Sequence, residues 1–135
     1  MLSLSSFTRR KLQSNIRLAA GVTLFAIGAG LYGLGAQQFA VGLFLPPWDK
    51  LAHALTFMVV GFTAGLATGS RGKQLVIHCV IGATAIGAMD EWHQVYLAGR
   101  SAGWDDLVAD AAGGLLGAAL LGGMYKAIHI WTKHR

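Results

Sequence analysis

Residues 107–125 read LVADAAGGLLGAALLGGMY, an apolar stretch that contains one charged side chain, Asp110. A helix needs about 20 apolar residues to span the roughly 30 Å of hydrocarbon in a bilayer. The stretch is therefore long enough to cross a membrane. It predicts a transmembrane helix that carries an acid within its apolar part.

Three similar stretches precede this one. Hydrophobic residues make up 54% of the 135-residue chain and charged residues only 13%, which is too apolar for an ordinary soluble protein. The 19 glycines fit the same conclusion, because glycine is frequent in membrane helices. We predict one all-α domain over residues 1–135, a four-transmembrane-helix bundle. Its spans are about 18–36, 51–68, 74–90 and 107–125, and the third continues past its apolar part into the interface.

The basic residues predict the orientation of the bundle. Nine of the 11 lysines and arginines lie before the first span, between the second and third spans, or after the fourth span. Only Lys50 and Arg100 lie on the other side. Because cytoplasmic loops carry the excess of basic residues, we predict an N-in, C-in topology. The net charge of +5 would by itself fit a nucleic-acid partner, but the basic residues flank apolar runs, where they suit anionic lipid headgroups. We therefore expect no nucleic-acid partner.

A cleaved signal peptide is the alternative for the first span. A basic segment precedes it, and it ends at the small residues Gly35 and Ala36. The span is long for a signal peptide, and Leu34 is a poor residue two positions before a cut after Ala36. In either case the second helix enters from outside.

All six carboxylates of the chain fall in the outer half of this topology, with two permanent cations and a histidine, His53, beside them. Asp106 and Asp110 are four residues apart and share a helix face with Gly113 and Gly117. Small residues at this spacing pack against a neighbouring helix, so the two carboxylates should point into the bundle.

The other two helices add polar residues at the same depth. Asp49 and His53 are four residues apart at the start of the second helix, and Glu91 and Gln94 are three apart at the end of the third. A purely structural network that fixes helix register is one interpretation. However, two cations cannot neutralise six acids, so some carboxyls are protonated, some are well solvated, or a ligand brings positive charge or hydrogen-bond donors. Of these alternatives we favour a ligand site.

The motifs, taken in order, are WDKLAH (48–53), DEWHQ (90–94), GRSA (99–102) and Asp106 with Asp110 before Gly113 and Gly117. In this order they resemble the VanZ-like family of small bacterial integral membrane proteins. That family's pattern is Asp-Lys-x-x-His, Glu-x-x-Gln, Gly-Arg and Asp-x-x-x-Asn/Asp-x-x-Gly. The resemblance covers residues 48–117 and implies a bacterial inner-membrane protein with a role in the cell envelope. The family takes its name from a protein that gives low-level teicoplanin resistance.

Two positions depart from the family pattern. Gly103 stands where many members carry an acid or a polar residue, and we expect it to loosen the loop around Arg100. Asp110 stands where many members carry asparagine, and its added negative charge favours a positively charged or metal ligand.

Three functions remain open from the sequence. The first is binding of a polar or lipid-linked ligand, such as a cell-wall precursor, at the outer face. Its ligand-binding residues would be Asp49, Lys50, His53, Glu91, Gln94, Arg100, Asp106 and Asp110. The second is a membrane-embedded hydrolase or transferase. Its catalytic candidates are His53, Glu91 and Asp106, and its metal candidates are Asp106 and Asp110.

The third function is a proton or small-solute transporter, for which His78 is the one candidate relay in the cytoplasmic half. The same histidine is also readily explained as a packed residue near the inner interface. Membrane lipids are expected partners in every case. The sequence leaves the enzyme question, the cofactor and the oligomeric state undetermined.

Overall fold

The computed structural model of the protein describes residues 6–37, 45, 47–99 and 102–134. Within these ranges the chain is helical and has no strand, which confirms the predicted all-α fold. All four helices are long and apolar enough to cross a membrane. They are α1 (Ser6–Gly35), α2 (Trp48–Thr68), α3 (Gly72–Gln94) and α4 (Trp104–Lys133).

The helices extend beyond the predicted spans, most of all towards the two chain ends. The first begins at Ser6 rather than Leu18, and the fourth ends at Lys133 rather than Tyr125. Those bounds were predicted for the membrane spans, and the helices are longer than the spans. A helix of 30 residues is about 45 Å long, which exceeds the roughly 30 Å of hydrocarbon. Apolar patterning marks only the part in lipid, whereas arginine, lysine and glutamine continue a helix into water.

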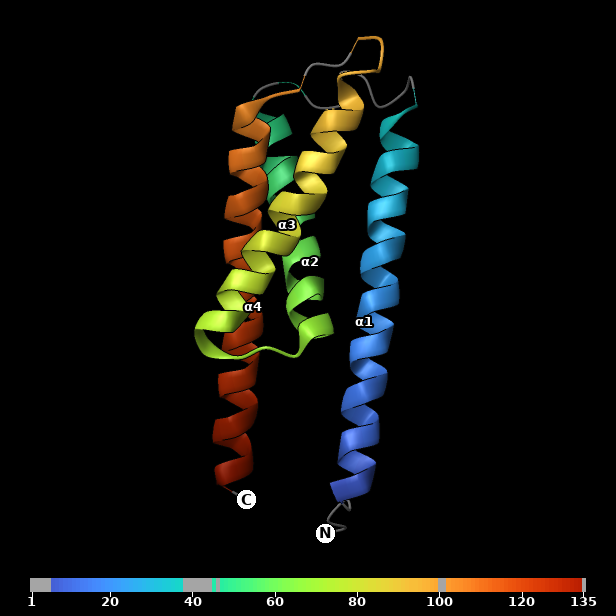
Figure 1. Ribbon diagram of the computed structural model, residues 1–135. Coiled ribbons are helices and arrows are strands. Elements are labelled where there is room, and N and C mark those ends of the chain that lie inside the picture. Colours follow the sequence, from blue (N-terminus) through green and yellow to red (C-terminus); the bar gives the residue numbers. More distant parts are fainter. Residues whose placement is uncertain (1–5, 38–44, 46, 100–101, 135) are drawn as a thin grey trace.

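Helices α2, α3 and α4 pack together, whereas α1 stands beside them and contacts mainly α2 (Figure 1). Every residue of α1 is described, and among them only Ala20 is buried. The first helix is therefore an outlying member of the bundle, and the other three form its core.

The contact between α2 and α4 depends on glycine. A Cβ atom added at Gly113 would lie 2.5 Å from the Ala54 carbonyl oxygen, and one at Gly117 would lie 2.5 Å from that of Met58. One at Gly61 would lie 2.8 Å from the Cα of Gly114. The predicted packing of these small residues is thus present, and it is formed within one chain.

Two groups of buried apolar residues fill the bundle. One joins α3 to α4 through Leu75, Cys79, Ala118 and Leu121. The other joins α2 to α3, and Leu24, Ile27 and Leu31 of α1 cover it. Cys79 is fully buried and acts as a packing residue, as its place in an apolar run predicts.

Helices α2 and α3 are joined by a short turn. Gly69 has a φ of 64°, and its N–H donates to the carbonyls of Gly65 and Leu66, an arrangement that glycine adopts without steric cost. His78 lies beside this turn, where its Nδ1 is 2.9 Å from Ser70 Oγ. This contact accounts for His78 as a hydrogen-bonded structural residue.

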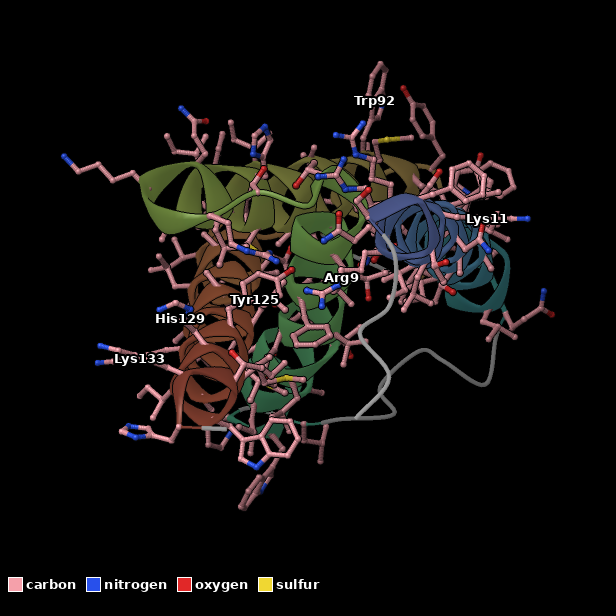
Figure 2. All side chains as sticks on the ribbon, turned by 90° about the horizontal axis from the view of Figure 1, so that it is seen from below. Arg9, Lys11, Trp92, Tyr125, His129 and Lys133 are labelled. Carbon is pink, nitrogen blue, oxygen red and sulfur yellow. The ribbon has the colours of Figure 1, made fainter. Side chains whose placement is uncertain are left out.

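The first helix begins and the fourth helix ends at the same end of the bundle (Figure 1). Viewed from that end, Figure 2 shows Arg9 and Lys11 on α1 and Lys133 on α4. The first turns of α2 and α4, which carry Asp49, Asp105 and Asp106, lie at the opposite end. Among the described residues, the acids therefore lie towards one end of the bundle, and the basic residues other than Lys50 lie towards the other.

We expect Gly117→Ala to destabilise the protein by about 1–3 kcal/mol, because the new methyl group must push α2 away from α4. The matched control is Gly123→Ala on the same helix, where a Cβ meets nothing within 4 Å. The control should be neutral or stabilising by up to about 1 kcal/mol through helix propensity. Unfolding by SDS titration in micelles measures both. Equal effects of the two variants would contradict the close contact.

Candidate functional site

The acids gather where α2 and α4 begin and α3 ends. Asp49 lies in the first turn of α2, and Asp105 and Asp106 lie in the first turn of α4. Carboxylates are stabilised there, because the helix dipole places partial positive charge at a helix N-terminus. Local helix physics thus explains three of the six acids, whereas Asp110 and Glu91 need partners from other helices.

Asp110 and His53 form the central contact of the site. Asp110 is fully buried in α4, and its Oδ1 lies 2.9 Å from His53 Nδ1 on α2. Gly87 of α3 leaves the space for this carboxylate, since a Cβ there would overlap the Asp110 side chain. When Asp110 is ionised and the imidazole is neutral, Nδ1 carries the proton and Nε2 presents its lone pair. His53 Nε2 lies 3.7 Å from Asp106 Oδ1.

Glu91 reaches the site because α3 continues past its apolar part, as predicted. The side chain is buried, and its Oε2 accepts a 2.7 Å hydrogen bond from the Gly103 N–H at the start of α4. Gly103 therefore joins Glu91 to α4 through its backbone N–H, and a Cβ atom at this position would overlap Asp105 Oδ1. No pattern in the sequence indicated this contact.

Lys50 folds back over the acids instead of extending into solvent. Its Nζ lies 2.6 Å from Asp106 Oδ1, 2.7 Å from Asp105 Oδ2 and 3.1 Å from Asp49 Oδ2. Asp105 thus joins the cluster, although it is absent from the predicted ligand set. Its place beside Asp106 in the sequence was the available signal.

Three predicted residues from three helices converge on one point. His53, Glu91 and Asp106 each offer a ligand atom, and these atoms all lie within 4.8 Å of one another. Two oxygen ligands of one divalent ion, each at about 2.0–2.6 Å, lie no more than about 4–5 Å apart. The spacing therefore suits a hard or borderline cation, or the amine or hydroxyl donors of an organic ligand.

The expected metal pair differs from this arrangement. The sequence pointed to Asp106 and Asp110, whereas the structure groups Asp106 with His53 and Glu91. Asp110 lies one helical turn after Asp106 in α4, and its Oδ1 contacts His53 Nδ1. A carboxylate behind a histidine in this way fixes the ring and its tautomer. Asp110 Oδ1 is therefore placed to position His53.

The remaining predicted residues lie around this centre. Gln94 is buried, and its Nε2 donates to Asp90 Oδ2 at 2.8 Å and lies 3.5 Å from Glu91 Oε1. Asp49 contacts Lys50. Arg100 lies outside the described residues, as does the expected effect of Gly103 on the loop around it.

The cluster has more acceptors than donors. Asp49 Oδ1, Asp90 Oδ1 and Asp110 Oδ2 are buried and have no hydrogen-bond partner among the described residues. Buried polar atoms are nearly always paired, and each unpaired one costs free energy. The arrangement therefore favours a ligand that donates hydrogen bonds or carries positive charge.

Comparison with known proteins identifies one family. A family model described as VanZ/LLP1 matches residues 3–125, which is most of the chain. No curated protein and no solved structure matches the chain.

We expect His53 and Asp110 to be energetically coupled. In a double-mutant cycle, His53→Ala and Asp110→Ala should show a coupling of about 1.5–3 kcal/mol, since each single variant leaves a buried partner unpaired. Asp105 is the matched control, because it is on the same helix and contacts Lys50 rather than His53. Additive effects for the His53 and Asp110 pair, measured by unfolding in micelles, would contradict the contact.

Proposed function

Because the chain belongs to the VanZ/LLP1 family, we propose that this multi-pass membrane protein acts in the bacterial cell envelope. There it binds a polar or lipid-linked ligand at the cluster of acids and His53. The resemblance to VanZ-like proteins extends the proposal to resistance against teicoplanin. The supporting observation is the convergence of His53, Glu91 and Asp106 from three helices, with Asp110 behind His53.

We place the protein in the cytoplasmic membrane with both chain ends inside. Nine of the 11 lysines and arginines belong to sequence segments that this topology places inside, and two belong to segments that it places outside. This orientation puts the cluster at the outer face, where cell-wall precursors are exposed.

The chemistry of the cluster suits a ligand with amine or hydroxyl groups. Carboxylates accept hydrogen bonds from such donors, and Asp106 and Glu91 each offer an oxygen within 4.8 Å of a ring nitrogen of His53. Lys50 adds one cation that can contact a phosphate or carboxylate of the same ligand. An amphiphile with a mixed polar headgroup therefore fits better than a simple anion.

A metal-assisted hydrolase or transferase is the second candidate, and the His53 contact favours it. Asp110 holds Nδ1, so Nε2 is available to take a proton from a water or hydroxyl group. A divalent cation held by Glu91 and Asp106 would polarise the substrate oxygen. In this mechanism His53 acts either as the general base or as a third ligand of the metal ion.

The orientation is testable by cysteine labelling of intact cells. Trp104→Cys at the start of α4 and Thr132→Cys near its end both replace exposed residues, and Cys79→Ala removes the buried native thiol. A membrane-impermeant maleimide should label position 104 in intact cells and position 132 only after lysis. The reverse pattern would invert the proposed topology.

Ligand binding is testable by extracting what copurifies with the protein. Wild-type protein should carry an organic ligand that His53→Ala and Asp106→Ala lose several-fold, because both remove donor or acceptor atoms from the convergence point. Asp105→Ala is the matched control, since its carboxylate is largely exposed and lies outside that group. Mass spectrometry of the extract is the measurement.

The same samples separate the two candidates. Near-stoichiometric metal by elemental analysis, lost in Asp106→Ala, would favour the enzyme. The same organic content in all variants, without metal, would contradict both. In a bacterial host, teicoplanin susceptibility should follow ligand content across these variants.

A further inference from the structure

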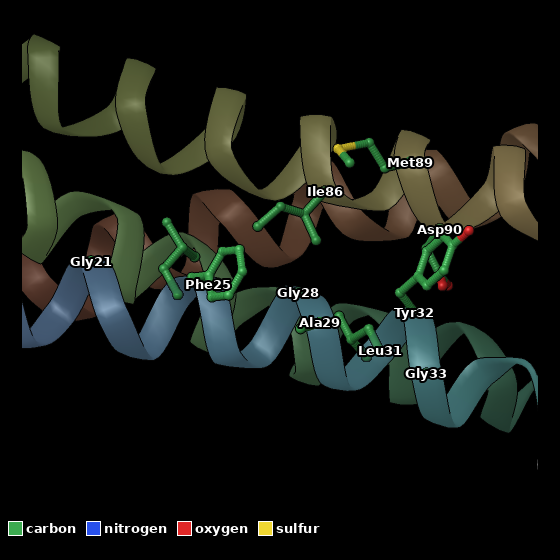
Figure 3. Close-up of a pocket in the computed structure, with 11 residues that line it drawn as sticks. Gly21, Phe25, Gly28, Ala29, Leu31, Tyr32, Gly33, Ile86, Met89 and Asp90 are labelled. Atoms are coloured by element: carbon green, nitrogen blue, oxygen red, sulfur yellow. The ribbon is translucent and has the colours of Figure 1, made fainter.

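A groove of about 580 Å³ runs between α1 and α3, outside the cluster described above. Its lining is almost entirely apolar and includes Phe25 and Leu31 of α1 and Ile86 and Met89 of α3. Figure 3 shows Asp90 at one end of the groove, beside Tyr32. Binding sites between the helices of a bundle commonly have this character, with an apolar lining and a few placed polar groups.

Glycine on α1 creates the space. Gly21, Gly28 and Gly33 line the groove, and a Cβ added at any of them would meet nothing within 4 Å. At these glycines α1 therefore does not pack closely against α3. Both helices are long and apolar enough to span a membrane, so the medium around the groove is hydrocarbon.

The length of the groove matches one leaflet. From Gly21 to Gly33 the helix rises about 18 Å at 1.5 Å per residue. Half of the hydrocarbon core is about 15 Å thick. The groove therefore has room along its axis for a hydrocarbon chain from a single leaflet, and it ends where that lipid's headgroup would begin.

Asp90 marks the polar end. Its Oδ2 accepts from Gln94, but its Oδ1 is buried and has no donor among the described residues. Beside it, the Tyr32 ring stacks on His93 with ring centroids 3.6 Å apart, which ties α1 to α3 at this level. The groove is therefore apolar along its length and negative at one end, which is complementary to a lipid whose headgroup carries N–H or O–H donors.

We propose that this groove binds one hydrocarbon chain of a membrane lipid whose headgroup donates a hydrogen bond to Asp90. Gln94 contacts both Asp90 and Glu91. It therefore links the polar end of the groove to the point where His53, Glu91 and Asp106 converge. The lipid is the ligand of the cluster, and in this respect the inference rests on the proposed function. It specifies that function by naming the ligand class as a donor-bearing amphiphile.

The test uses photoaffinity labelling in phosphatidylcholine vesicles. The probe is phosphatidylethanolamine with a diazirine in one acyl chain, and its comparison is phosphatidylcholine with the same chain, whose headgroup has no N–H. Adducts of the ethanolamine probe should be several-fold denser on the groove-lining faces of α1 and α3 than on exposed Val108 and Leu115 of α4. Excess unlabelled phosphatidylethanolamine should remove the groove adducts in the wild-type protein.

Two variants locate the site. Gly28→Leu fills the groove and should lower groove labelling several-fold. Gly30→Leu is its matched control, because a Cβ there also meets nothing within 4 Å but Gly30 does not line the groove. Asp90→Asn removes the headgroup's charged acceptor and should reduce the preference for the ethanolamine probe.

The outcomes are distinct. Even labelling around the bundle, or equal labelling of Gly28→Leu and Gly30→Leu, would overturn the groove as a binding site. If Asp106→Ala still loses its copurified ligand in that case, the proposed function stands and this inference fails. If Gly28→Leu loses groove labelling but keeps the copurified ligand, the groove binds a lipid that is not the ligand of the cluster, and the proposed link is overturned.

Discussion

The contact between Asp110 and His53 depends on the close packing of α2, α3 and α4. A carboxylate inside an apolar helix is costly, and such residues face the bundle interior and take a polar partner there. His53 can serve as partner only because glycine lets α2 and α4 approach closely, with Gly117 against the backbone of α2. Gly87 admits the same carboxylate from the side of α3. One buried acid thereby constrains the packing of three helices.

The same contact gives the site its chemistry. It orients the imidazole so that Nε2 lies 3.7 Å from Asp106 Oδ1. Lys50 contacts three carboxylates and so offsets part of their negative charge. Buried acceptor oxygens nevertheless remain unpaired among the described residues. A purely structural network should leave few such atoms, because each one costs stability. This excess of hydrogen-bond acceptors is the physical reason for inferring a ligand site rather than a purely structural network.

Helix α1 differs from the other three. It has one buried residue, Ala20, and several glycines that face open space rather than another helix. In water such a helix would be poorly stabilised, but in lipid its apolar surface is solvated by hydrocarbon. Loose packing of α1 therefore leaves a groove beside Asp90 without the cost that a cavity would impose in a soluble core.

Hydrophobicity and charge along the chain determined the class of fold, the four apolar spans and the gathering of acids at one end, because those properties depend on composition over whole segments. The family was indicated by the order and spacing of short motifs. The hydrophobic pattern did not predict the helix ends at Ser6 and Lys133, since helices continue past the lipid. Only the tertiary structure decided that Asp110 positions His53 while Glu91 joins Asp106. Helical spacing places residues on one face of one helix, whereas the rotation and depth of neighbouring helices determine which atoms meet between them.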